Sequence, residues 1–331
     1  MLSDRGKRWV RRSARVLLAV MLSAALLLGA AWTALWLEYQ GKPSASARGT
    51  GHDALWLGHA WVDGRKNQSD VDALVERLHT TGIRELFVHT GPFNDDGTLD
   101  PGRLPQGRWF TRAIHQALPG VRVQAWLGAH AIPSTFRVLA SVAQVLDEGF
   151  DGIHYDFEPI ADGDRGLLAV LRETRALTRQ RRAVLSVSAI HNEPWQGMAA
   201  CLSVLPASPA LWSERYLREV ALEVDQVALM AYDTTLLTQA TYGGYVRRAT
   251  EAALRAVPAE VALYIGIPAY HDHHALRNSK AETVGAALRG VRLAIGDRPL
   301  NREFGVAMYV DFAATDGDWA SYHEGWAGLR P

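Results

Sequence analysis

The sequence has a single cysteine, Cys201, among 331 residues. An intramolecular disulfide and a metal site built from cysteines are therefore excluded. Net charge is lacking too, because 35 basic residues balance 35 acidic ones, so no overall field favours nucleic acid. No Gly-x-Gly-x-x-Gly follows the first expected strand, which argues against a dinucleotide-binding fold. The chain is 48% hydrophobic and 21% charged, which is typical of a globular protein with a large core.

The N-terminus combines a basic flank with a long uncharged run. Residues 1–15 contain six Lys or Arg side chains, and residues 16–37 contain no charged one. As a helix this run would be about 33 Å long, enough to cross a bilayer and longer than a usual signal-peptide core. We therefore expect an uncleaved membrane anchor with the basic flank in the cytoplasm and the remainder outside. The small residues 29–31 leave open a cleaved signal and a secreted protein.

The rest of the chain divides into a linker and one domain. Residues 38–52 are rich in Gly, Ser and Ala and are expected to form a flexible linker. In residues 53–331, apolar runs of strand length alternate with helical stretches. The expected strands are 54–60, 85–89, 122–127, 152–158, 183–190, 226–232, 261–267 and 305–311. Eight such units predict an α/β protein with a closed (β/α)₈ TIM barrel, and a doubly wound open sheet is the alternative.

Helical patterns lie between these strands. They are expected at residues 69–79, 134–146, 165–179, 213–223 and 250–256. The sequence Ser279-Lys280-Ala281-Glu282 also fits a capping box that would open a further helix.

One segment, residues 151–159, has the most informative pattern in the chain. It reads Asp-Gly-Ile-His-Tyr-Asp-Phe-Glu-Pro and fits a buried strand that ends in two acids. Because strands alternate their faces, His154, Asp156 and Glu158 should point one way and the apolar side chains between them the other. Two acids about 7 Å apart at the end of such a strand cost stability unless they are paired or perform chemistry. Crowding also separates their pKa values, which keeps one acid protonated and able to donate.

This segment resembles the fourth-strand signature of family 18 glycoside hydrolases, Asp-Gly-x-Asp-x-Asp-x-Glu, found in chitinases and endo-β-N-acetylglucosaminidases. Residues 224–233 resemble the sixth strand of that family, which ends in Met-x-Tyr-Asp. The resemblance implies retaining hydrolysis of β-linked glycans that contain N-acetylglucosamine, without a metal or other cofactor. The nucleophile would be the acetamido group of the substrate itself, an exception to the usual two-carboxylate scheme.

The resemblance also assigns roles to individual residues. Glu158 would be the general acid and base that protonates the leaving oxygen, and Asp156 would orient the acetamido group. Tyr232 would hydrogen-bond the acetamido carbonyl. Asp233 and Met230, from the same motif, would belong to the sugar-binding site.

Two positions depart from the family pattern. His154 stands where the family has an Asp, and an imidazole replaces the hydrogen bond of that Asp but not its negative charge. Tyr309 stands where many members have a Trp beneath the sugar. We keep both as binding-site candidates, together with Trp61 and Trp126, whose aromatic faces suit the apolar face of a pyranose.

Two functions other than hydrolysis of N-acetylglucosamine-containing glycans also fit the sequence. One is a noncatalytic, chitinase-like protein that binds glycans, although such proteins usually lose the acid that is present here as Glu158. The other is a barrel glycosidase for sugars without an acetamido group. In every case the expected partners are a glycan and, through residues 16–37, a membrane, but no nucleic acid.

Overall fold

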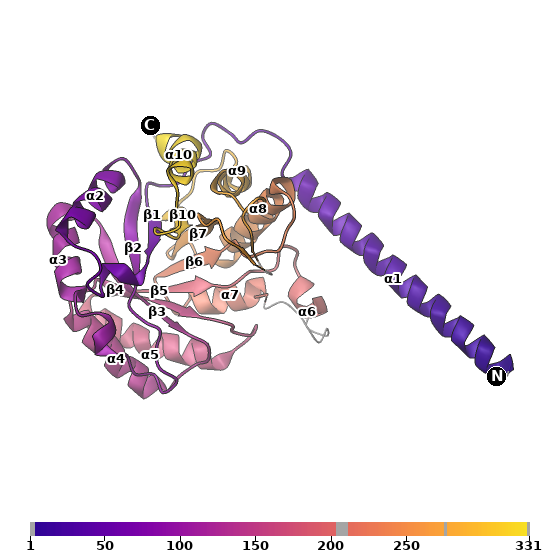
Figure 1. The fold of residues 1–331 in the computed structure, drawn as a ribbon, viewed down its shortest axis with the longest axis horizontal. Coiled ribbons are helices and arrows are strands. Elements are labelled where there is room, and N and C mark those ends of the chain that lie inside the picture. The colour runs from indigo at the N-terminus through magenta and orange to yellow at the C-terminus, as the bar shows by residue number, and fades with distance from the viewer. Residues whose placement is uncertain (1–3, 203–210, 275–276, 330–331) are drawn as a thin grey trace.

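The computed structural model describes residues 4–202, 211–274 and 277–329. Its centre is a closed barrel of eight parallel strands (Figure 1). In order around the barrel, the strands are β1 (Asp53–Leu57), β10 (Phe304–Tyr309), β7 (Ala262–Pro268), β6 (Gln226–Met230), β5 (Val184–Ala189), β4 (Gly152–Phe157), β3 (Arg122–Ala129) and β2 (Ile83–His89). All eight expected strands are present, so the (β/α)₈ prediction is confirmed and the open-sheet alternative is wrong.

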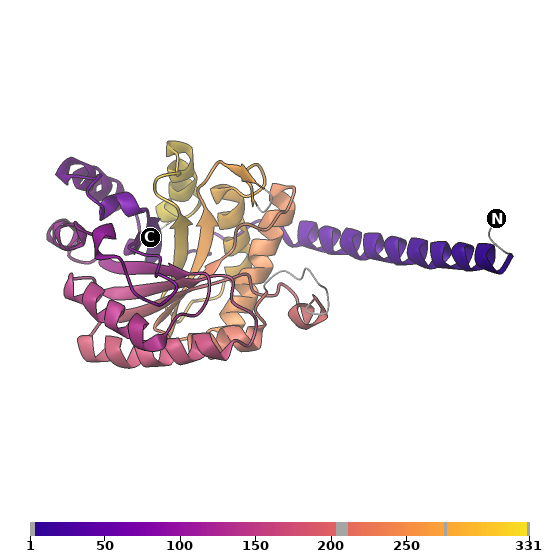
Figure 2. The ribbon, with the colours of Figure 1, turned by 60° about the horizontal axis from the view of Figure 1, so that its bottom comes forward.

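Helices cover the outside of the barrel (Figures 1 and 2). They are α2 (Gln68–His79), α3 (Gly107–Ala117), α4 (Thr135–Asp147), α5 (Arg165–Arg181), α7 (Glu214–Ala221), α8 (Gln239–Ala256), α9 (Val284–Ile295) and α10 (Asp316–Gly325). Shorter elements are α6 (Met198–Leu202), the 3₁₀ turns His59–Trp61, Pro101–Arg103 and Ala327–Leu329, and the small hairpin of β8 (His273–His274) and β9 (Arg277–Asn278).

The helix predictions need three corrections. Helix α8 begins at Gln239 and not at residue 250, because Gly243 and Gly244, which weaken a helix in isolation, are needed here for close packing. The proposed capping box does not open α9, which is capped by Thr283 instead. Helices α3 and α10 were not predicted, and α3 lacks the usual side-chain cap because Gln106 makes no such hydrogen bond.

Strand β4 alternates its faces as expected. The ring of His154 stacks on Phe87 inside the barrel, with ring centroids 3.8 Å apart. The hydroxyl of Tyr155 points the opposite way and lies 2.8 Å from the Thr174 hydroxyl on α5. This alternation directs the side chains of even-numbered residues on β4 toward the barrel axis.

A single long helix, α1 (Asp4–Glu38), precedes the barrel and projects away from it (Figures 1 and 2). Its portion Arg15–Glu38 is long and apolar enough to cross a membrane. Only its last turns touch the domain, since Leu35 is buried while residues 15–30 are exposed.

The stretch expected to be a flexible linker, residues 38–52, is instead held along α9. Arg289 donates hydrogen bonds to the carbonyl oxygens of Tyr39 and Gly41, and Arg292 donates to those of Ser44 and Ala47. The composition suggested flexibility, but the backbone of this stretch provides acceptors for two arginines of α9. We call residues 39–52 the strap.

Candidate active site at the barrel mouth

The carboxylate of Asp156 lies at the end of β4, where the barrel opens. Its Oδ2 accepts a hydrogen bond from the indole nitrogen of Trp126, on the neighbouring strand β3, over 2.8 Å. The two residues reach each other because Trp126 pairs with His154 in the ladder, two residues before Asp156 on the same face of β4. The other oxygen, Oδ1, is buried and has no hydrogen-bond partner among the residues that the structure describes. A buried acceptor of this kind is costly unless a protonated neighbour or a ligand supplies a donor.

Glu158 follows β4 and lies beside Asp156. Its backbone nitrogen continues the ladder by donating to the Ala129 carbonyl over 2.9 Å, which fixes where the side chain begins. Burial, and after it the charge of Asp156 and a hydrogen bond to that carboxylate, raise the pKa of Glu158 from its ordinary value of 4.5 to about 9, with a smaller contribution from Asp233. Glu158 therefore holds its proton at neutral pH, as a general acid must.

His154 lies deeper in the barrel and has no exposed surface. Trp56 donates its indole N–H to Nε2 over 3.1 Å, so Nδ1 carries the proton and donates to the Ser186 hydroxyl over 2.7 Å. The Ser188 hydroxyl also bonds Nε2, over 2.9 Å. Burial lowers the pKa of His154 to about 3, so the ring is neutral. It supplies no charge to Asp156, whose hydrogen-bond donor is Trp126.

Aromatic rings form the wall of the mouth next to the acids. Tyr232, two residues after β6, stacks on Tyr309 at the end of β10, with centroids 5.0 Å apart and planes within 17°. Trp56 contacts both rings edge-on, at 6.4 and 5.7 Å. Burial, and after it the neighbouring Tyr309 and Asp156, raise the pKa of Tyr232 well above its ordinary value, so its hydroxyl stays protonated.

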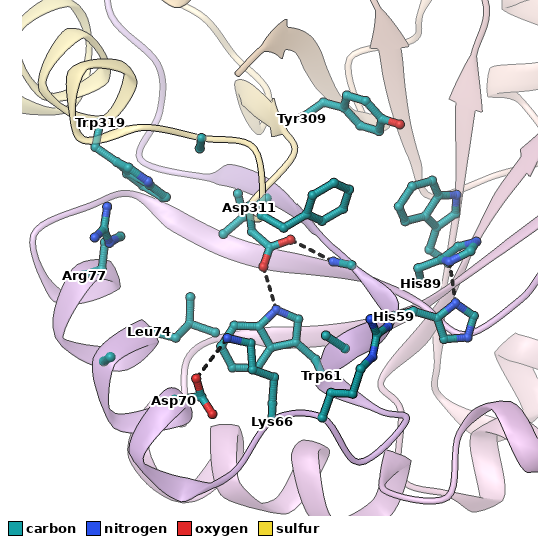
Figure 3. Close-up of a pocket in the computed structure, with 18 of the residues that line it drawn as sticks. His59, Trp61, Lys66, Asp70, Leu74, Arg77, His89, Tyr309, Asp311 and Trp319 are labelled. Carbon is teal, nitrogen blue, oxygen red and sulfur yellow. Dashed lines mark hydrogen bonds and ion pairs between the residues drawn. The ribbon is translucent and has the colours of Figure 1, made fainter. Parts of the chain in front are cut away.

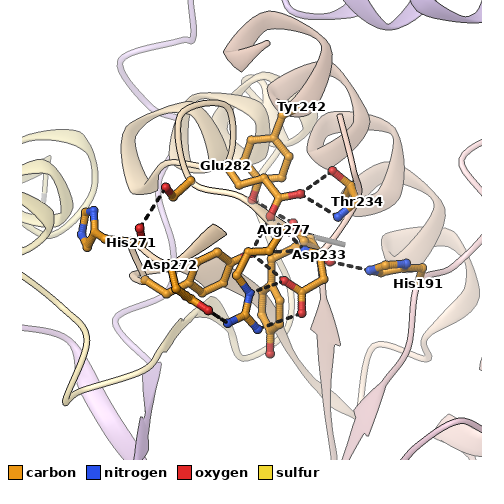
Figure 4. Close-up of polar contacts among 12 residues, drawn as sticks. His191, Asp233, Thr234, Tyr242, His271, Asp272, Arg277 and Glu282 are labelled. Carbon is orange, nitrogen blue, oxygen red and sulfur yellow. Dashed lines mark hydrogen bonds and ion pairs between the residues drawn. The ribbon is translucent and has the colours of Figure 1, made fainter. Parts of the chain in front are cut away.

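Asp233 is held in a polar cluster beside this wall (Figure 4). Arg277 binds both of its carboxylate oxygens, at 2.7 and 3.0 Å, and the Tyr270 hydroxyl donates to Oδ1 over 2.9 Å. Its backbone has a positive φ of 59°, and its nitrogen donates to the buried carboxylate of Glu282. The same carboxylate accepts from the backbone and the hydroxyl of Thr234. Asp233 is therefore fixed from several sides, in a backbone conformation that Asp tolerates better than most residues.

A groove of about 920 Å³ extends from the mouth between α2 and α10 (Figure 3). Trp126 is among its lining residues, and Tyr309 and Trp319 lie well apart along it. Along its floor, the indole nitrogen of Trp61 donates to Asp311 over 2.6 Å. The groove gives an extended ligand a path away from the two acids.

The structure brings most, but not all, of the expected site residues together. Those that gather at the mouth are Asp156, Glu158, Tyr232, Tyr309, Trp126 and Asp233. His154 supports this group from below. Two expected residues do not join the group. Met230 is largely buried at the end of β6. Trp61 lies in the groove and is only 6% exposed, with Phe110 and Lys66 against its ring. In the described part of the chain, no three His, Cys, Asp or Glu side chains are arranged to hold a metal ion.

No protein-family model matches the sequence, and no curated protein matches it either. Solved structures do match in fold. The spore cortex-lytic enzyme SleL of Bacillus megaterium QM B1551 shares 12% identity with a TM-score of 0.57, over 83% of this chain and 74% of that chain. A chitinase from Chromobacterium violaceum ATCC 12472 shares 15% identity with a TM-score of 0.58, over 82% and 98%. A class V chitinase from Pseudomonas fluorescens Pf-5 shares 12% identity with a TM-score of 0.55, over 83% and 98%.

The chain has a chitinase-like barrel fold. The resemblance that the two strand motifs indicated is therefore confirmed for the fold, and identities of 12% to 15% extend it no further.

Several residues of the chitinase-like barrel's mouth escaped the sequence analysis. Trp56, Tyr270, Arg277 and Glu282 had no assigned role, yet each contacts a residue of the candidate site. Glu282 carried a signal that pointed elsewhere, since its spacing from Ser279 suggested a helix cap. Arg277 had no signal at all, because its partner Asp233 is 44 residues away in the sequence.

Proposed function

We propose that this protein is a retaining glycoside hydrolase that acts on β-linked, N-acetylglucosamine-containing glycans. One observation carries the proposal: protonated Glu158 hydrogen-bonds the carboxylate of Asp156, whose buried Oδ1 accepts from no N–H group of the described residues. The N–H of a substrate acetamido group would satisfy that oxygen. Trp126 occupies the other oxygen and so presents Oδ1 to the ligand.

The reaction would follow from these positions. Glu158 gives its proton to the glycosidic oxygen as the bond to the anomeric carbon breaks. The acetamido carbonyl oxygen, aligned by Asp156 and by the hydroxyl of Tyr232, attacks that carbon from the opposite face and forms an oxazolinium intermediate. Water then attacks the same carbon, and the Glu158 carboxylate takes its proton. Two displacements retain the configuration.

The neutral His154 bears on whether such a site works without the family's second Asp. The hydrogen bonds of His154 go to Trp56, Ser186 and Ser188, so it leaves Asp156 free to interact with Glu158 and a ligand. We therefore assign His154 a positioning role and propose that the site is catalytic without a second Asp. Tyr309 would form part of the sugar site, because its ring stacks on Tyr232 and is only partly buried. Asp233, Met230 and Trp61 would act mainly by shaping the mouth and the groove.

We further propose that α1 anchors the domain in a membrane, with the barrel outside the cytoplasm. Residues 15–30 of this helix are exposed in the structure, as expected for a helix that contacts lipid and not protein. A cleaved signal is the alternative. Mass measurement of the N-terminus in the membrane fraction separates the two.

The decisive experiment measures hydrolysis of soluble N-acetylglucosamine oligomers by the native chain and by Glu158→Gln. Loss of the acid should lower kcat by about 10²- to 10⁴-fold while ligand binding is retained. Glu173→Gln, an exposed carboxylate on α5, is the matched control and should change nothing. Binding without turnover by the native chain would favour the noncatalytic rival. Equal turnover of glucosides that lack the acetamido group would favour the other rival.

A further inference from the structure

The position of α1 determines which end of the barrel faces a membrane. In a (β/α)₈ barrel each helix starts at the mouth and runs toward the opposite end. The last turns of α1 lie against the N-terminal half of α8, where the backbone of Leu35 is so close to Gly244 that a Cβ at Gly244 would lie 1.8 Å from the Leu35 carbonyl oxygen. Arg247 and Arg248, one turn further on, both pair with Glu38. The anchor therefore meets the barrel at its mouth end.

The path of the strap independently places the end of α1 at the mouth end of the barrel. Arg289, in the first half of α9, holds the carbonyl of Tyr39, and Arg292 holds those of Ser44 and Ala47. Beyond the helix, Asp297 accepts from Ser44 and Ser46. The chain thus descends along α9 from the mouth end at residue 39 to the opposite end, where β1 starts. In both views α1 extends away from the barrel on the side on which α6, the short helix after β5, also lies (Figures 1 and 2).

Exposed apolar side chains concentrate at this same end. Outside α1, and within the described residues, four large hydrophobic side chains are at least half exposed: Phe136 at 82%, Leu237 and Phe312 at 75%, and Leu222 at 51%. The first three follow β3, β6 and β10, so they stand around the rim of the mouth. Only Leu222, after α7, lies at the opposite end. Exposed Leu and Phe at the end of a domain where an apolar helix is attached are the side chains expected at a lipid interface.

There is little slack between the anchor and the barrel. The uncharged run ends at Leu37, yet Leu35 is already buried against the domain. Two residues of helix span about 3 Å, so the mouth would lie at the membrane surface. Charges on the rim are mixed, with Asp162 and Lys280 among them, and add no strong attraction or repulsion.

We propose that the barrel mouth faces the membrane and docks its rim, through Phe136, Leu237 and Phe312, on the bilayer that holds α1. This inference rests on the proposed function for its substrate, which would be a lipid-linked N-acetylglucosamine glycan in that same bilayer. Such a glycan rises from the lipid surface directly into the mouth, and the groove accommodates its distal sugars. A large polymer distant from the membrane would have to enter between the rim and the lipid.

The orientation is tested with the full chain in phosphatidylcholine–phosphatidylglycerol vesicles that contain spin-labelled lipids. In a Cys201→Ser background, a single cysteine carrying a fluorophore is placed at residue 136, 237, 222 or 27. Labels at 136 and 237 should lose fluorescence as strongly as the label at 27, within α1, whereas the label at 222 should keep it. Quenching at 27 alone overturns the proposed orientation. No quenching at any position overturns the orientation and the anchor together.

Docking between α1 and α8 has its own matched pair of variants. Gly244→Val should separate the helices, since its side chain has no room beside Leu35, and the rim labels should recover fluorescence while the label at 27 does not. Gly285→Val, on α9, has open space around its Cβ and should leave all labels unchanged. Unaltered rim quenching in Gly244→Val would contradict the anchor-based orientation.

The substrate is tested by comparing a lipid-linked N-acetylglucosamine oligosaccharide in the vesicles that carry the enzyme with a soluble oligomer. We expect the double variant Phe136→Ser, Leu237→Ser to lose roughly tenfold of the rate on the lipid-linked substrate, because two apolar contacts with lipid are removed. Its rate on the soluble oligomer should stay unchanged. Equal losses on both, or no cleavage of the lipid-linked substrate by a chain that cleaves the soluble one, overturn the substrate assignment. Rim quenching with no cleavage of either overturns the proposed function alone.

Discussion

Trp126 donates its indole N–H to Asp156 across two adjacent strands, over 2.8 Å, at the point where the barrel opens. That contact occupies one carboxylate oxygen and leaves the other available in the mouth. Asp156 is thus oriented before any ligand binds, which is the kind of preorganisation that active sites depend on.

Trp126→Phe keeps the ring but removes this donor. We expect kcat on N-acetylglucosamine oligomers to fall by about 10- to 100-fold, because a hydrogen bond to a charged group is worth about 1.5–3 kcal/mol. KM should change less, since the ring face remains. Steady-state kinetics against Trp109→Phe, a partly buried Trp on α3 outside the mouth, makes the comparison. A higher KM with an unchanged kcat would show that Trp126 serves only as a stacking surface for the substrate.

Glu158 should make the stability of the protein depend on pH in a specific direction. Its folded-state pKa is raised above the ordinary 4.5, so the folded protein holds a proton that the unfolded chain has released. Stability is therefore fully present below pH 4.5 and falls as the pH rises from there through the raised folded value. Glu158→Gln removes this term, so the variant should gain stability over the native chain as pH increases.

Urea unfolding of the native chain and of Glu158→Gln, repeated at intervals of about one pH unit between roughly pH 4 and 9, measures this difference in stability. The two curves should converge at the acid end and separate toward the alkaline end. Parallel curves at every pH would mean that the carboxyl of Glu158 is solvated in the folded protein.

Arg277 should be worth far more to the fold than most ion pairs in this chain. Its guanidinium is 16% exposed and binds Asp233 through two nitrogens. We expect Arg277→Met to lower the free energy of unfolding by about 3 kcal/mol, because it leaves a partly buried carboxylate unpaired. Arg277→Lys should recover only part of this loss. It restores the positive charge, but one ammonium cannot bind both oxygens in the same geometry.

Arg172→Met provides the comparison for that measurement. Arg172 pairs with Glu223 on the surface and is 64% exposed, so its loss should cost less than about 1 kcal/mol. Equal losses in the two variants would show that the Asp233 cluster is as well solvated as the surface.

Position 154 should not tolerate Asp, the residue that stands there in the signature of family 18 glycoside hydrolases. In His154→Asp, the stack on Phe87 and the acceptor for Trp56 are both lost, and a carboxylate enters a site with no exposed surface. We expect a loss of about 3–5 kcal/mol in unfolding free energy at neutral pH, which shrinks as the solution is acidified and the new carboxyl takes a proton. Thermal unfolding at pH values on either side of neutrality, compared with His154→Gln, would reveal this. A stability that does not depend on pH would mean that the pocket around residue 154 already suits an anion.

The sequence was most informative where its signals are local. Strand alternation placed His154, Asp156 and Glu158 on one face of β4, and the eight apolar runs gave the eight strands of the barrel. Both signals depend only on neighbours along the chain, so they survive folding unchanged. The uncharged run before the domain also reads directly as one long helix.

What the sequence could not supply were contacts between residues far apart in the chain. Nothing near Asp156 indicates that Trp126, 30 residues earlier, will donate to it. Glu282 looks like a helix cap because a capping box is also a local pattern, but its carboxylate accepts instead from the backbone nitrogens of Asp233 and Thr234. The Gly243–Gly244 pair weakens the expected start of α8, and only distant contacts explain why two glycines are there: Gly244 lies against Leu35 of α1, and Gly243 against Tyr39 of the strap and the backbone of α9.

The strap has a practical consequence for preparing the domain without its long helix. Gly49 packs against the indole of Trp326, Thr50 is paired with Phe304 at the start of β10, and Ala47 has no exposed surface. A shortened chain that began at Asp53, where the first strand starts, would strip these partners and leave Arg289 and Arg292 without their carbonyl acceptors. Truncation just before Tyr39 keeps the whole strap, and it is the boundary that crystallographers should choose.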